Sequence, residues 1–364
     1  MSSPANLEIR TSTEARRRFR IAITESCNLK CFFCHGDGGD VQHFSAQEST
    51  LLPSEIAEVI RLASLAGVKK VKLTGGEPLL YRSAEGGVNR AVEFAAAAAH
   101  EAKIDLSLVT NGISLTPQLA VSLRSAGLPR ITISLHAGRQ ETFASYAGLS
   151  AGSRQFHSVV RGIRAAIDSG LEPVKVNTVV YYSASDESRR NLDELPVILD
   201  LCGQLGVSQV KFFVVLQSPK LAQDSHRDSF VFWTDRLLDQ VIPSSALSGM
   251  RTLLKDKRLE RFAAPGSFSA TFDIGNEMPK ISFQNLKLRA QEDGHSGACN
   301  CHEGAYSLRM TSRGELKACL WDREVKNLLV PLRAGDVETA YSMISHSLSK
   351  IHCDREVVTL ASAA

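Results

Sequence analysis

The sequence predicts an α/β fold, a partial (βα)6 barrel of the TIM type whose mouth is closed by a C-terminal α+β extension. Six short β-rich runs alternate with helical patterns over the first 216 residues, which is typical of a parallel sheet covered by helices. Glycines separate four of the helical patterns from the next strand, as C-cap glycines do: Gly67, Gly127, Gly170 and Gly206. Six repeats are fewer than the eight of a closed barrel, so we expect the barrel to stay open.

The expected elements alternate in a regular order along the core. Strands are expected at 20–24, 71–74, 105–110, 131–135, 174–180 and 210–216. Helices are expected at 54–66, 87–102, 117–126, 153–169 and 191–205, and Pro53-Ser54 and Thr116-Pro117 are typical helix starts. Active sites of such folds gather at the C-terminal ends of the strands. The residues that follow each strand are therefore the candidate functional residues.

The regular alternation ends near residue 216. Helical patterns at 228–241 and 245–262 precede a Gly-, Pro- and Phe-rich segment at 263–284 that we expect to be loop and short strand. A hairpin around Gly314 and a helix at 337–351 follow. The chain is thus expected to divide into a core, 1–216, and a C-terminal extension, 217–364.

The composition excludes several classes of protein. Apolar residues make up 43% and charged residues 22% of the 364 residues, which is the ordinary globular balance. The sequence has no run of about 18 apolar residues, as a membrane-spanning helix needs. The first 20 residues lack the apolar core of a signal peptide, so we expect a cytoplasmic location and no membrane. A net charge of +3 is too small to indicate nucleic-acid binding.

Six of the eight cysteines fall in two clusters, one after the first expected strand and one in the extension: Cys27, Cys31, Cys34, Cys299, Cys301 and Cys319. In a reducing cytosol, clustered thiols indicate metal or redox chemistry rather than disulfides. Cys202 lies alone in an apolar helical stretch and is expected to be buried and inert. The sequence leaves the role of Cys353 open.

The first cluster has the spacing C-x3-C-x2-C, from Cys27 to Cys34. Three thiolates on one loop can bind three irons of a [4Fe–4S] cluster and leave the fourth iron open. Structural zinc sites instead pair C-x2-C units with further ligands, and no such partner lies nearby in the sequence. The spacing therefore favours an iron–sulfur cluster.

Further motifs follow the next three strands. The second strand ends in TGGEP at 74–78, where two glycines would let the backbone approach a ligand and Glu77 could accept from an ammonium group. The third ends in Thr110-Asn111-Gly112 and the fourth in SLH at 134–136. Each motif alone is a common turn. A lone histidine such as His136 is slightly more often a packing residue than a catalytic one. At successive strand ends the three motifs indicate one site.

The cysteine loop and these motifs together resemble the radical S-adenosylmethionine (SAM) superfamily. In that family the open iron chelates the amino and carboxylate groups of SAM, and an electron from the cluster cleaves the sulfonium to give a 5′-deoxyadenosyl radical. The resemblance implies that Cys27, Cys31 and Cys34 are the cluster ligands and that an external one-electron donor exists. It also implies contacts to SAM from six residues: Phe33, Gly75, Gly76, Glu77, Ser134 and Leu216.

The C-terminal half narrows this resemblance to the GTP 3′,8-cyclase branch, through LRMTSRGELKACL at 308–320 and LLVPLRAG at 328–335. That branch makes the first pterin precursor of molybdenum cofactor. The resemblance implies a small anionic substrate, GTP, and a second [4Fe–4S] cluster held by Cys299, Cys301 and Cys319. It implies five residues that contact the substrate: Arg20, Lys72, Thr110, Lys175 and Arg309.

Three departures from this branch fall on the substrate side. The extension has C-x-C-x17-C where the family has C-x2-C-x13-C, Ser307 replaces the first arginine of an R-x-R pair, and the sequence ends without Gly-Gly. Two alternatives therefore stay open. One is a related radical SAM enzyme with a nucleoside, sugar-nucleotide or peptide substrate. The other is a non-catalytic iron–sulfur redox protein, which would have no use for the TGGEP motif.

Overall fold

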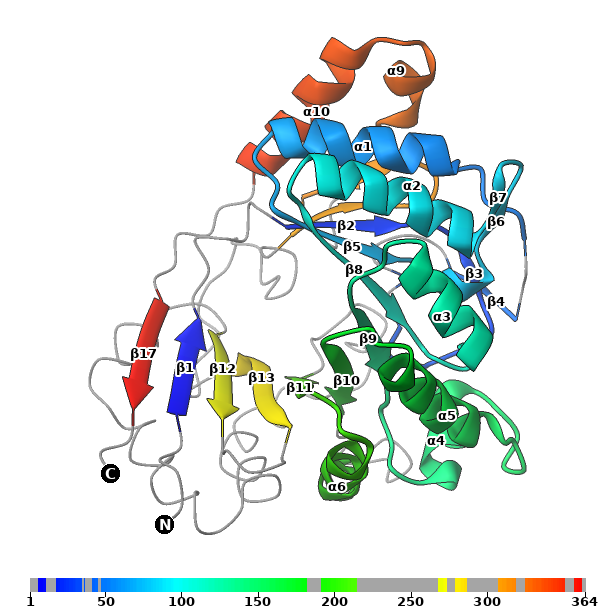
Figure 1. Ribbon diagram of the computed structural model, residues 1–364, viewed down its shortest axis with the longest axis vertical. Coiled ribbons are helices and arrows are strands. Elements are labelled where there is room, and N and C mark those ends of the chain that lie inside the picture. The colour runs from blue at the N-terminus through cyan, green and yellow to red at the C-terminus, as the bar shows by residue number, and fades with distance from the viewer. Residues whose placement is uncertain are drawn as a thin grey trace, which may run out of the picture.

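The computed structural model describes residues 6–10, 18–34, 36, 41–44, 47–181, 191–214, 268–273, 279–286, 307–318, 325–350 and 357–361. In these segments a 13-stranded sheet runs through the molecule (Figure 1), and two pairs of short strands lie beside it. The order of the strands has two ends, β16 (Lys326–Asn327) and β17 (Val357–Ala361). The described strands therefore form an open sheet.

Six parallel strands form the centre of this sheet, in the order in which the chain reaches them. They are β2 (Arg18–Ala22), β5 (Lys70–Thr74), β8 (Asp105–Thr110), β9 (Ile131–Ser134), β10 (Val174–Val180) and β11 (Gln209–Val214). Their helices are α1 (Pro53–Leu65), α2 (Val88–Glu101), α3 (Pro117–Ser125), α5 (Gln155–Asp168) and α6 (Leu195–Leu205). These elements confirm the α/β class and the repeats predicted for residues 20–216.

One short helix was not predicted. The α4 helix (Gln140–Ala147) lies between β9 and α5 and ends at Gly148, whose φ of +67° is left-handed. Its eight residues span only about two turns, and no side chain caps its first turn. A helix of this length gives too little periodicity for recognition from the sequence.

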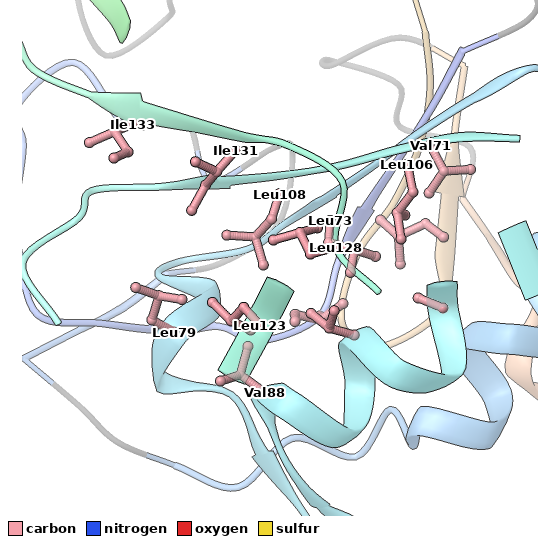
Figure 2. Packing of buried hydrophobic residues seen from close by; sticks show 14 of the residues in the cluster. Val71, Leu73, Leu79, Val88, Leu106, Leu108, Leu123, Leu128, Ile131 and Ile133 are labelled. Carbon is pink, nitrogen blue, oxygen red and sulfur yellow. The ribbon is translucent and has the colours of Figure 1, made fainter. Parts of the chain in front are cut away.

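Alternation along the central strands divides the sheet into two faces, because successive side chains of a strand point to opposite sides. Figure 2 shows the apolar side chains of β5, β8 and β9 packed with residues of α2 and α3. The labelled residues on these elements are Val71, Leu73, Leu106, Leu108, Ile131, Ile133, Val88 and Leu123. The alternate residues, among them Lys72 and Ser107, point to the face opposite to these helices.

Further strands, from the extension and from the N-terminal segment, lie at both edges of the central six. Beyond β11 lie β13 (Lys280–Leu286), β12 (Phe268–Asp273), β1 (Asn6–Arg10) and β17. Beyond β2 lie β14 (Leu308–Met310), which is parallel to it, then β15 (Glu315–Lys317) and β16. Strands of six and seven residues thus occupy much of 263–284, where loop and short strand were expected.

The β14–β15 pair is the hairpin predicted around Gly314. It leads to α9 (Leu329–Arg333) and α10 (Val337–Ser349), and α10 packs beside α1 (Figure 1). The α10 helix confirms the helix predicted there but ends two residues earlier. The helices expected at 228–241 and 245–262 lie outside the described residues, and the division at residue 216 stays a prediction.

The remaining described elements are short. They are β3 (Ser26–Cys27), β4 (Gln42–His43), β6 (Arg82–Ser83), β7 (Gly86–Gly87) and the 3-10 turns at Pro78–Leu80 and Leu192–Glu194. Among the helices of the described segments, none is both long and apolar enough to span a bilayer.

Candidate functional site

The cysteine loop, residues 27–34, follows β2 at the C-terminal edge of the sheet. Its backbone is fixed by the end of α4, because Lys30 N donates to the Ala147 carbonyl at 2.9 Å and Phe32 N donates to that of Tyr146 at 3.3 Å. A Cβ on Gly148 would lie 3.1 Å from the Lys30 carbonyl oxygen. The helix that was not predicted thus positions the predicted loop.

The three thiols of the loop differ in exposure: Cys27 is buried, Cys31 is half-buried and Cys34 is exposed. Burial, with smaller contributions from the charges of Glu77 and Cys34, raises the pKa of Cys27 to about 12. Burial also raises the pKa of Cys31, and the charges of Cys34 and Cys27 add to that effect. Over the described segments, no three metal-ligating side chains gather as they would around a single ion. A donor set of three thiols on one loop fits a cluster in which each iron takes one thiolate.

Gly75 and Gly76 allow the turn after β5 to pack closely against residues 24–26, the segment that leads into the cysteine loop. Gly76 N donates to the Thr24 carbonyl at 2.8 Å, and Glu77 N donates to that of Ser26 at 2.7 Å. A Cβ on Gly76 would lie 2.3 Å from the Ser26 carbonyl oxygen, and one on Gly75 would lie 2.6 Å from that of Thr24. A side chain at either glycine would therefore displace the segment that leads into the cysteine loop, a reason for both glycines that the sequence did not reveal.

The Glu77 carboxylate joins the turns that follow β5 and β8. It is 1% exposed. Its Oε1 accepts from Thr110 Oγ1 at 2.5 Å and from Leu79 N at 3.0 Å, and its Oε2 accepts from Asn111 N at 2.6 Å. Burial raises the pKa of Glu77 to about 7, and these donors oppose the rise. Both oxygens thus accept from the chain's own donors, whereas the sequence predicted an ammonium partner.

Thr110 and Asn111 extend this network. Thr110 Oγ1 also accepts from Gly112 N at 3.0 Å, so the structure places the predicted substrate contact in a buried turn. Asn111 Nδ2 donates to Asn28 Oδ1 at 2.7 Å. Since Asn28 belongs to the cysteine loop, the network links the ends of three strands.

Aromatic rings cover one side of the cysteine loop. Phe33 lies 4.9 Å from the ring of His136, 5.7 Å from that of Tyr146 and 5.6 Å from that of Tyr181, between centroids. His136 accepts at Nδ1 from Val179 N at 2.8 Å, and burial lowers its pKa to about 3. A neutral His136 therefore packs in this cluster. Ser134 lies nearby, partly exposed, at the end of β9.

Cationic residues occupy neighbouring strands on the face of the sheet opposite to α2 and α3. Arg309 on β14 pairs with Arg20 on β2, and Arg20 pairs with Lys72 on β5. Paired residues of neighbouring strands share one face of a sheet. Burial and then the charges of Arg20, Lys211, Arg18 and Lys175 lower the pKa of Lys72. The four cations predicted from separate segments are thus brought together.

Two members of this basic cluster were missed by sequence reasoning, Arg18 and Lys211. Lys211 stands between the buried residues Val210 and Phe212 of β11. The alternation of that strand, with a lysine between two buried residues, is the signal that could have identified it.

Four predicted site residues lie outside the described part of the chain: Leu216, Cys299, Cys301 and Cys319. Their roles stay predictions. Cys353, whose role the sequence leaves open, also lies outside it. Cys202 is fully buried in α6, which confirms the prediction of a buried thiol, and burial raises its pKa to about 12.

Comparison with known proteins gives consistent matches. The radical SAM superfamily matches residues 21–195. A probable GTP 3′,8-cyclase of Thermoplasma volcanium is 36% identical over 301 residues, 83% of this chain and 79% of the relative. One from Saccharolobus islandicus is 37% identical over 211 residues. That second match covers 57% of this chain and only 61% of the relative's length.

Solved structures share the fold at low identity. Streptococcus suis SuiB bound to its precursor peptide SuiA has a TM-score of 0.54 at 14% identity, covering 85% of this chain and 62% of SuiB. SuiB bound to S-adenosylmethionine has a TM-score of 0.53, also at 14% identity, covering 89% of this chain and 63% of SuiB.

The superfamily match contains the cysteine loop and all three strand-end motifs. The match to the Thermoplasma relative extends over most of both chains. The chain belongs to the radical SAM superfamily, whose cofactors are SAM and a [4Fe–4S] cluster, and within it to the group of GTP 3′,8-cyclase relatives.

Proposed function

We propose that the protein is a radical SAM enzyme whose Cys27, Cys31 and Cys34 hold a [4Fe–4S] cluster. The observation that carries this proposal is the cysteine loop, fixed by α4 on one side and by the Gly75-Gly76 turn on the other. When bound, the cluster and SAM supply a 5′-deoxyadenosyl radical that can abstract a hydrogen atom from a substrate. An external one-electron donor completes the proposal.

SAM is proposed to lie at the C-terminal edge of the sheet. Phe33 presents a ring beside the cysteine loop on which adenine can pack. The backbone of Gly75 and Gly76 and the hydroxyl of Ser134 offer polar contacts, and Leu216 is retained as a backbone contact to adenine. Glu77 then acts mainly by holding three turns in place, since its oxygens already accept three hydrogen bonds.

The proposed substrate is GTP, which would be cyclised by loss of the C3′ hydrogen and bond formation from C3′ to C8. The basic cluster supports an anionic substrate, because arginine and lysine side chains on neighbouring strands of one face are suited to bind phosphate groups. The names of the relatives at 36% and 37% identity support GTP in particular. The remaining proposed contact, Thr110, would act through Glu77.

Replacing either Lys175 or Arg309 with alanine is expected to raise the KM for GTP. Each lost charge-assisted hydrogen bond is worth about 1.5–3 kcal/mol, or roughly 10- to 150-fold in KM. Steady-state kinetics under anaerobic conditions measure it, with Lys326→Ala on the exposed β16 as the control. SAM cleavage without substrate should persist in both variants. Wild-type kinetics in both would contradict the anion site.

A second cluster, held by Cys299, Cys301 and Cys319, is proposed for the extension. Reconstituted protein should then contain about eight irons per chain. Replacing these three cysteines with alanine should remove about half of that iron, whereas Cys202→Ala should remove none. About four irons in the wild-type protein would contradict the second cluster.

One reaction tests the proposed function. Anaerobically reconstituted protein is incubated with SAM, dithionite and GTP, and 5′-deoxyadenosine and the cyclised nucleotide are measured. The alternative of a different substrate, a nucleoside, a sugar nucleotide or a peptide, is favoured by Ser307, which leaves one phosphate donor fewer than the R-x-R pair would supply. 5′-Deoxyadenosine without cyclised product would support that alternative. No cleavage of SAM at all would support a redox protein.

A further inference from the structure

The topology brings two distant segments together at the C-terminal edge of the sheet. β2 and β14 are parallel neighbours, so the residues that follow each strand emerge side by side. The segment after β2 leads through Glu25 into the cysteine loop. The segment after β14 is the turn of the hairpin, residues 311–314.

Glu25 bonds to this turn through both of its carboxylate oxygens. Arg313 Nε lies 2.6 Å from Oε1 and Arg313 Nη2 lies 3.0 Å from Oε2, while Ser312 Oγ donates to Oε1 at 3.2 Å. The Arg313 side chain is 56% exposed and that of Glu25 is 18% exposed. A two-pronged arginine–carboxylate contact fixes orientation as well as distance. We call these three residues the clasp.

The turn that carries Arg313 is held by hydrogen bonds from residues 327 and 328. Asn327 Nδ2 donates to the Arg313 carbonyl at 2.9 Å, and Leu328 N donates to that of Gly314 at 2.8 Å. Gly314 has a φ of +84°, and a Cβ there would lie 2.4 Å from Leu329 Cγ. The clasp therefore binds Glu25 to a turn whose position is fixed by its own hydrogen bonds and packing.

The clasp connects the segment before the cysteine loop, where the radical is proposed to form, with the hairpin after Arg309, which is proposed to bind the substrate. Glu25 stands two residues before Cys27, and its carbonyl oxygen would lie 2.6 Å from a Cβ on Gly76. Arg313 stands four residues after Arg309, which belongs to the basic cluster. Hydrogen abstraction requires the reacting atoms to lie about 3–3.5 Å apart, and a displacement of about 1 Å can cost up to about 100-fold in rate. The clasp joins the segment that leads into the cysteine loop to the hairpin that carries Arg309.

We propose that Glu25, Ser312 and Arg313 are positioning residues that hold the substrate-side hairpin in register with the cysteine loop and so couple radical formation to hydrogen abstraction. This inference rests on the proposed function. If the clasp is weakened, SAM is still cleaved, but a larger share of the 5′-deoxyadenosyl radicals is lost without conversion of the substrate.

The test compares two arginine–glutamate pairs of the same geometry. Arg313→Ala breaks the clasp, and Arg333→Ala breaks the control pair with Glu55, which joins α9 to α1 at 2.6 and 3.1 Å. Exposed ion pairs contribute little to stability, so both variants should fold. With SAM, dithionite and GTP, Arg313→Ala should raise the ratio of 5′-deoxyadenosine to product about threefold or more, and Arg333→Ala should not change it. The exchanged pair, Glu25→Arg with Arg313→Glu, should restore part of the coupling.

Hydrogen exchange gives a second measurement that needs no substrate. In Arg313→Ala, the amides of residues 26–34 and 307–318 should exchange faster than in the wild-type protein, whereas Arg333→Ala should leave them unchanged. Unchanged exchange at 26–34 would overturn the clasp, as would an unchanged coupling ratio. If the wild-type protein cleaves SAM but does not convert GTP, the choice of GTP fails and the exchange data still decide on the clasp.

Discussion

Replacing Cys27, Cys31 and Cys34 together with alanine is expected to abolish SAM cleavage. An alanine offers no atom that can bind iron, so the loop loses every protein anchor that it provides for the cluster. The fold should persist, because the loop is fixed through its backbone, by Lys30 N and Phe32 N on the end of α4. The measurement is 5′-deoxyadenosine formed from SAM and dithionite, together with the iron content of the reconstituted protein.

Cys202→Ala is the matched control for this variant, since it removes a buried thiol from α6, away from the loop. It should keep the iron and the cleavage activity of the wild-type protein, at a cost in stability of about 1 kcal/mol for the lost packing. If the triple variant still forms 5′-deoxyadenosine, the radical SAM proposal is wrong.

The repeating core could be predicted because its signals are local. Each central strand is a short β-rich run, and helices begin at features such as Thr116, whose side chain accepts from Leu119 N at 3.1 Å. Glycine endings such as Gly206, with a φ of +80°, can be recognised without knowledge of the tertiary structure. The C-x3-C-x2-C spacing is equally local, so it could be recognised in the sequence, and its role as a set of cluster ligands stays a prediction.

What the sequence did not reveal depends on contacts between distant segments. The strands β12 and β13 lie in a Gly-, Pro- and Phe-rich segment, and they form by pairing with β1 and β11, far away in the chain. Gly75 and Gly76 are required by the approach of residues 24–26, about 50 positions earlier. Lys211 joins the basic cluster only through the register of parallel strands. Single-sequence patterns do not contain such pairings.

Glu77 shows the difference between what a sequence motif predicts and what the tertiary structure adds. The TGGEP motif placed it correctly at the end of the second strand, and its acidity indicated a cationic partner. In the structure its partners are two backbone N–H groups and one hydroxyl, because the turn after β8 lies within reach only once β5 and β8 pair. The residue was found from the sequence, and its partners were found from the fold.

Glu77→Ala is expected to lower the free energy of unfolding by about 3–9 kcal/mol, because it leaves three donors without an acceptor at about 1–3 kcal/mol each. Glu77→Gln should cost less, about 2–3 kcal/mol, since the glutamine oxygen can face only one of Leu79 N and Asn111 N while its NH2 faces the other. Thr110→Val removes the hydroxyl that donates to Glu77 and that accepts from Gly112 N, and should cost about 1–3 kcal/mol. Urea unfolding of the three variants measures these differences.

The pH dependence of unfolding distinguishes the ionisable Glu77 side chain from a neutral glutamine of the same shape. Burial raises the pKa of Glu77 from 4.5 to about 7, so the folded state favours the protonated form. The stabilising contribution of this group is therefore complete below pH 4.5 and is lost as the pH rises through about 7, a change of about 3 kcal/mol. Glu77→Gln should remove this slope between pH 4.5 and 7. SAM cleavage should fall most in Glu77→Ala, because Asn111 N then has no acceptor at this position and Asn111 loses the bond that aligns it with Asn28 in the cysteine loop. It should fall less in Glu77→Gln, which keeps an acceptor for one of Leu79 N and Asn111 N. A Glu77→Gln variant with wild-type stability, slope and cleavage would show that these bonds do not hold the site together.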